Sequence, residues 1–128
     1  MSEFDWDNLA EEIESLGRSQ RRELASQVRR VMRHLLKLEA SPASDPRAGW
    51  HSSIYEARGE IAGVLRDSPS LRRQVDGIIA EEINLAAKLA VADLAQHGEP
   101  ADAVSARIAA GGFTAEQVIG DWFPEVSP

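Results

Sequence analysis

Three ionisable side chains stand at the borders of apolar stripes on three different predicted helices, namely Glu12, His34 and Arg58. A carboxylate beside an imidazole can transfer a proton or bind a metal ion, and a guanidinium can hold an anion in place. Glu11, Arg18 and Lys37 accompany them in the same segments of the sequence. These six residues form the candidate polar cluster of the chain.

The candidate polar cluster has two interpretations. In the structural one, its charges form a closed salt-bridge network that holds the helices in register, because a desolvated charge needs a partner. In the functional one, Glu12 and His34 share a polar pocket in which they move a proton or bind a metal ion. We favour the structural interpretation, since ion-pair networks also perturb pKa values without catalysing a reaction.

Sequence motifs for catalysis are absent. The chain has no Gly-rich phosphate loop, no nucleophile elbow and no His-Glu-x-x-His motif, and it contains no cysteine. A di-iron helical bundle requires Glu-x-x-His, but Val31, Ala48 and Leu94 stand three residues before the histidines. We therefore predict no catalytic residue, no cofactor and no metal ligand.

Basic residues form a stripe along one predicted helix, and such a stripe can bind a nucleic-acid backbone or an acidic partner. Its members are Arg18, Arg22, Arg29, Arg33 and Lys37. The net charge of −7 opposes binding to nucleic acid or to an anionic membrane, and no aromatic residue is interleaved to stack on bases. We expect a solvated or internally paired face rather than a nucleic-acid interface.

Apolar residues recur every three or four positions along most of the chain, which predicts helices. Gly17 is expected to end the first helix, Ser19 to cap the second, and Gly77 to mark a kink or break in a long later one. Thr114 and Gln117 have the spacing of a capping box, and Trp122 and Phe123 are expected to anchor the tail. The expected helices are 6–16, 19–39, 50–65, 69–96 and 101–110, with an exposed loop over 40–49.

The composition agrees with a folded helical domain. Of 128 residues, 43% are hydrophobic and 27% charged, and no apolar run is long enough to span a membrane. Neither a secretory signal nor a cysteine framework is present, so we expect a cytoplasmic protein. The predicted architecture is one all-α domain over 1–128, an antiparallel bundle of about four main helices with a short helical C-terminal extension.

Several segments together resemble the bacterial family known as domain of unknown function 29. They are DNLAEEIESLGRS (7–19), HLLK (34–37), Trp50 and DSPSL (67–71), and the resemblance covers about residues 4–94. Members are small helical proteins with no established activity, so the resemblance implies a fold and no function. Many members carry a further N-terminal segment with Tyr and Trp, and a Trp where this chain has Leu38; the segment is not found here.

Long helices in so short a chain leave apolar faces that need a partner. The first functional hypothesis is therefore a noncatalytic protein-interaction module, with a homodimer as one form of it. The alternative is a metal-binding or hydrolytic protein that uses Glu12, His34 and Arg58. A third hypothesis, weaker than both, is nucleic-acid binding through the basic stripe.

Overall fold

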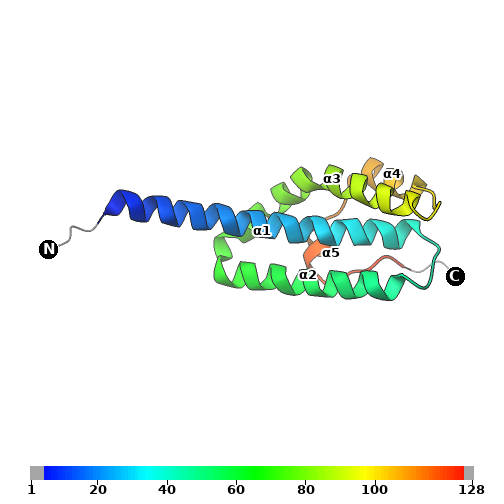
Figure 1. The fold of residues 1–128 in the computed structure, drawn as a ribbon, viewed down its shortest axis with the longest axis horizontal. Coiled ribbons are helices and arrows are strands. Elements are labelled where there is room, and N and C mark those ends of the chain that lie inside the picture. Colours follow the sequence, from blue (N-terminus) through cyan, green and yellow to red (C-terminus); the bar gives the residue numbers. More distant parts are fainter. Residues whose placement is uncertain (1–4, 126–128) are drawn as a thin grey trace.

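The computed structural model describes residues 5–125, and all of their regular elements are helices (Figure 1). In chain order they are α1 (Trp6–Ala40), α2 (Arg47–Asp67), the 3₁₀ helix η1 (Pro69–Gln74), α3 (Val75–Ala95), α4 (Asp102–Ala109) and α5 (Ala115–Ile119). α2 runs antiparallel to both α1 and α3, and α4 and α5 pack on these three (Figure 1). The prediction of an all-α bundle is confirmed.

α1 is one uninterrupted helix of 35 residues, or about 50 Å. The predicted stop at Gly17 and the predicted cap at Ser19 are therefore wrong. A glycine inside a helix costs only about 1 kcal/mol, so it does not end a helix whose flanking turns are favourable. The predicted N-terminal cap is confirmed, because the backbone N–H of Asn8 donates to the Asp5 carboxylate at 3.1 Å.

The first turns of α1 project beyond the ends of α2 and α3 (Figure 1). We call residues 6–19 the α1 arm. Its residues are exposed except for the half-buried Leu9, whereas Gln20, the next residue, already contacts the bundle through the hydroxyl of Ser68. The arm is thus a helix of nearly four turns that the other helices of the described range, residues 5–125, do not cover.

The core lies where α1, α2 and α3 face one another. α1 contributes the largest share, and its buried apolar residues keep helical spacing from Leu24 onward. Ile54, Ile61 and Ile78 are fully buried on the two facing helices. The α1 members are Leu24, Val28, Val31, Met32, Leu35, Leu36 and Leu38.

The C-terminal third closes one side of this core. The break expected near Gly77 falls at Gln74 and Val75, where the 3₁₀ turn becomes α3, and Gly77 itself is helical. The capping box at Thr114 and Gln117 is present with both of its hydrogen bonds. Trp122 and Phe123 pack half-buried against the core, as the sequence predicted.

Candidate functional site

The structure does not bring the candidate polar cluster together. Glu11, Glu12 and Arg18 are exposed on the α1 arm. His34 follows Glu12 by 22 residues on the same helix, which separates them by about 33 Å. Two side chains so far apart on one straight helix cannot share a proton or a metal ion.

His34 lies half-buried within the bundle, and its Nδ1 atom is buried without a hydrogen-bond partner among the described residues. Burial first, and then the positive charges of Lys37, Arg33 and Arg30, lower the pKa of its imidazole to about 4, against the opposing effect of Asp93. His34 is therefore neutral at pH 7. It fills space between charged neighbours instead of joining a carboxylate.

Lys37, one turn further along α1, takes part in a charged network with α3. Its ammonium group lies 3.1 Å from the carboxylate of Asp93, and only 10% of the lysine side chain is exposed. The guanidinium of Arg33 donates two hydrogen bonds of 2.8 Å to the same carboxylate. Arg33 first and Lys37 second hold the pKa of Asp93 at about 2, against the opposing effect of burial.

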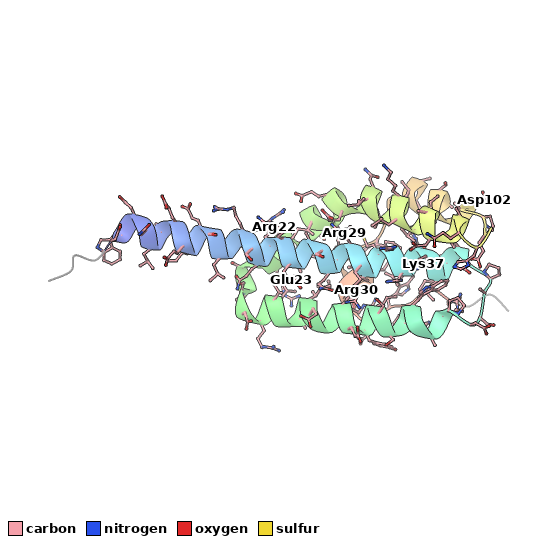
Figure 2. All side chains as sticks on the ribbon, viewed as in Figure 1. Arg22, Glu23, Arg29, Arg30, Lys37 and Asp102 are labelled. Carbon is pink, nitrogen blue, oxygen red and sulfur yellow. The ribbon has the colours of Figure 1, made fainter. Side chains whose placement is uncertain are left out.

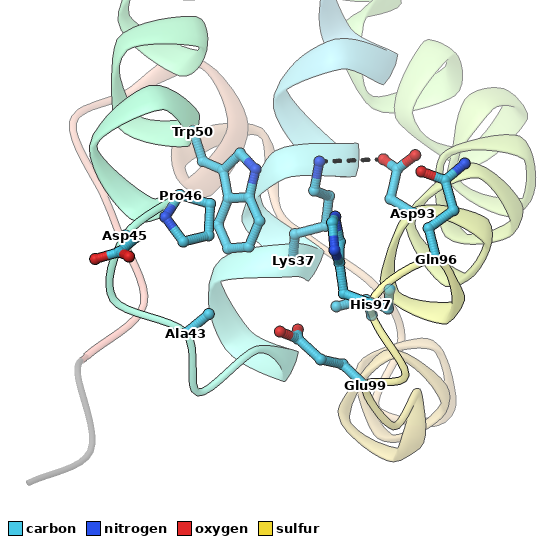
Figure 3. A pocket seen from close by; sticks show the side chains of 10 residues that line it. Lys37, Ala43, Asp45, Pro46, Trp50, Asp93, Gln96, His97 and Glu99 are labelled. Carbon is cyan, nitrogen blue, oxygen red and sulfur yellow. Dashed lines mark ion pairs between the residues drawn. The ribbon is translucent and has the colours of Figure 1, made fainter.

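A cavity of about 600 Å³ opens beside this network, between the ends of α1 and α3 and the start of α2. Lys37 lies over the indole of Trp50, 4.9 Å from the ring centroid, and His97 and Glu99 project into the same space (Figure 3). The ammonium group thus contacts a carboxylate on one side and an aromatic face on the other. Such a lysine is well held but is not free to act as a nucleophile.

Arg58 lies on α2 and binds the C-terminal segment, not His34 or Glu12. Its guanidinium donates to the carbonyl oxygens of Val118 at 2.9 Å, Gln117 at 2.8 Å and Trp122 at 2.6 Å. It also lies over the ring of Phe123, 4.8 Å from the centroid. Since the last carbonyls of a helix have no partner within the helix, Arg58 caps the end of α5 and fixes the tail.

The basic stripe on α1 is largely paired within the chain. Arg29 donates to Glu82 of α3 at 2.6 Å, and Arg30, beside it, to Glu56 of α2 at 3.0 Å (Figure 2). Arg33 and Lys37 share Asp93, as described above. These contacts support the internally paired face that the sequence analysis favoured.

The acidic partners in these networks were missed by the sequence analysis. Asp93 pairs with α1 from α3, and Glu39 accepts two hydrogen bonds from Arg107 of α4. Acidic residues on the 69–96 helix were the available signal, since Glu81, Glu82 and Asp93 all face arginines of α1. Which carboxylate meets which arginine depends on the offset between helices, and a single sequence does not specify that offset.

The chemistry available to the described residues is that of charge pairing and packing. Within residues 5–125, no group of three or more His, Cys, Asp or Glu side chains is placed to hold a metal ion. None of the helices in that range is both long and apolar enough to cross a membrane. Among the described residues, several exposed apolar side chains gather on one side of the α1 arm, where Ile13 and Leu16 are 61% and 60% exposed.

Comparison with known proteins gives one result. The model of a family described as domain of unknown function DUF29 matches residues 1–121. No curated protein and no solved structure matches the chain.

Proposed function

The chain belongs to the DUF29 family, and we propose that it functions as a noncatalytic helical protein-interaction module whose contact surface is the α1 arm. The observation that carries this proposal is the exposure of the arm's apolar side. Trp6, Ile13 and Leu16 are 71%, 61% and 60% exposed, and Leu9 stands between them. These are the residue types that helices bury against a second surface.

The exposed stripe continues the side of α1 that forms the core. Ile13 precedes the fully buried Leu24 by eleven residues, about three complete helical turns, so both lie on one side of the helix. The side that α2 and α3 cover in the bundle is thus left uncovered in the arm. An isolated helix of fewer than about 12–15 residues is marginally stable in water, so a partner on this side stabilises the arm itself.

The other side of the arm indicates what kind of surface it meets. It carries Asp7, Glu11 and Glu14, and Glu12 lies at the border of the apolar stripe; all four are exposed. Negative charge opposes approach to an anionic membrane and to nucleic acid. A protein surface with an apolar strip and basic residues at its edge is the complementary partner.

The alternative hypotheses have less support. A metal-binding or hydrolytic site of Glu12, His34 and Arg58 needs side chains that lie about 33 Å apart on α1, or that bind different segments. Nucleic-acid binding by the basic stripe requires Arg29, Arg33 and Lys37 to leave their carboxylate partners. Neither hypothesis gives the exposed apolar residues of the arm a role.

Site-specific photo-crosslinking tests the proposal in the cells from which the protein comes. A benzophenone side chain at position 13 lies on the apolar stripe, and one at position 11, on the opposite side of the same helix, is the matched control. We expect a discrete protein adduct from position 13 and none from position 11. Absence of any adduct at position 13, with the protein present at normal levels, would rule out an interaction through the arm.

A further inference from the structure

We propose that the partner of the α1 arm is a second copy of this chain, with the two arms packed antiparallel. In this arrangement the acidic arm of each copy lies against the arginine-rich end of the other copy's bundle. This inference rests on the proposed function and identifies the partner.

The spacing of the apolar residues fits a helix-to-helix seam. Trp6, Leu9, Ile13 and Leu16 follow one another at intervals of three, four and three residues, the pattern of a two-helix coiled coil. After Leu16 that pattern reaches Gln20 and Glu23, which are polar. The seam therefore ends where the bundle begins, so its length matches the free length of the arm.

The position of the bundle decides the orientation of the two arms. α2 and α3 cover the same side of α1 that is apolar in the arm, and they stop short of it (Figure 1). A parallel partner on the seam would run directly into α2 and α3 as its own α1 continued. An antiparallel partner instead enters the space beyond the ends of α2 and α3, and its own bundle lies past the tip of the first arm.

Charge complementarity favours the same antiparallel orientation. The arm carries the exposed carboxylates of Asp7, Glu11, Glu12 and Glu14, of which Glu14 pairs with Arg18 of the same arm at 4.0 Å, and Asp5 caps its N-terminus. The end of the bundle beside the arm carries three exposed arginines, Arg66, Arg72 and Arg73, which form no ion pair within residues 5–125, with Asp67 as a neighbouring acidic residue. The two acidic arms lie side by side in either orientation, but only an antiparallel partner also brings the tip of each arm to the arginines at the end of the other copy's bundle.

Sedimentation equilibrium over a range of concentrations and salt tests the association. We expect a dimer that weakens as salt increases, because part of the attraction is between exposed charges. The variant I13E/L16E should dissociate at least about 100-fold more readily, since it places carboxylates in the seam. L85E/V91E, at two apolar positions of α3 that are 44% and 38% exposed, is the control and should leave the dimer unchanged.

Charge reversal tests the contact between arm and bundle end. R72E/R73E and D7R should each weaken the dimer by about tenfold, because Asp7 lies at the tip of the arm that meets the other copy's bundle. The variant that combines them should recover most of the lost affinity, because the opposite charges face one another again. Two weakened variants without recovery in the combination would overturn the proposed contact.

Disulfide trapping distinguishes the two orientations, since the chain has no native cysteine. An antiparallel seam places Leu9 of one arm opposite Ile13 of the other, whereas a parallel seam places the two Leu9 positions opposite each other. A mixture of the Leu9→Cys and Ile13→Cys variants should form a mixed disulfide on mild oxidation, while Leu9→Cys alone should not. A disulfide between two Leu9→Cys chains would show a parallel pair and overturn the antiparallel arrangement.

The photo-crosslinking result separates this inference from the proposed function. An adduct of twice the chain mass from position 13 supports the second copy. An adduct with a different protein, from a chain that stays monomeric in sedimentation, overturns the second copy and leaves the interaction module standing. No adduct together with a monomer overturns both.

Discussion

The ammonium of Lys37 and the carboxylate of Asp93 lie 3.1 Å apart, with 10% and 19% of their side chains exposed. This pair joins α1 to α3, and the guanidinium of Arg33 completes it. Of the candidate polar cluster, only Lys37 belongs to this network, and its acidic member is Asp93 instead of Glu12. These contacts predict how the loss of the Asp93 carboxylate changes the stability of the protein.

Asp93→Asn is expected to lower the free energy of unfolding by about 2–4 kcal/mol, because it leaves the nearly buried Lys37 without a counter-ion. Urea denaturation followed by circular dichroism measures this change. The control is Arg18→Gln, which removes an exposed pair with Glu14 at 4.0 Å and should cost less than about 0.5 kcal/mol. Equal costs for the two variants would contradict the structural role of Asp93.

Acid is expected to destabilise the protein in two steps. Burial, assisted by Lys37, keeps the pKa of His34 near 4, so below the usual 6.5 the unfolded chain binds a proton that the folded chain does not. His34 therefore does not reduce the free energy of unfolding above pH 6.5. As the pH falls from 6.5 towards 4, the free energy of unfolding decreases. Asp93, with a pKa of about 2 instead of 3.8, adds a second loss below pH 3.8.

Unfolding measured between pH 7 and pH 4 tests the first of these steps. The slope for the wild-type chain should be no more than about 1 kcal/mol per pH unit, allowing for solvent screening at a half-buried position. His34→Gln, which does not titrate, should make the profile flatter in this range. A profile unchanged by the substitution would mean that His34 titrates normally in the folded chain.

Arg58→Ala is expected to release the C-terminal segment while leaving the three long helices folded. Three carbonyl oxygens of residues 117, 118 and 122 lose their donor, which should cost about 2 kcal/mol. Hydrogen exchange should increase in residues 113–125 and stay unchanged in α3. Arg58→Lys should recover only part of the protection, because one ammonium group cannot reproduce the planar fork that reaches all three oxygens.

The sequence predicts the helix ends and caps of this protein better than the contacts between its helices. Local signals placed the ends of α2 and α4 within three residues, and Thr114 with Gln117 predicted a capping box that is present. Those signals act between neighbouring residues, so a sequence contains them. The pairing of Lys37 with Asp93 and of Arg58 with the tail depends on how helices are offset in space, and neither followed from spacing along the chain.

The error at Gly17 has the same origin and gives the last prediction. Glycine and serine are common at helix ends because they tolerate non-helical backbone. A helix can nevertheless continue through either residue. Gly17 is helical in α1, and a Cβ atom added there meets no atom within 4 Å. Gly17→Ala should therefore stabilise the chain by as much as about 1 kcal/mol, because alanine is the better helix former.

The opposite result is expected at a glycine that does end a helix. Gly111 follows α4 with a φ of +104°, a backbone conformation that residues with a Cβ atom rarely adopt. Gly111→Ala should lower the free energy of unfolding by about 1 kcal/mol or more. If α1 were instead interrupted at Gly17 in solution, with a left-handed residue at that position, Gly17→Ala would destabilise the chain as Gly111→Ala does. The sign of the change at Gly17, measured by urea denaturation, therefore decides whether the α1 arm is continuous with the bundle.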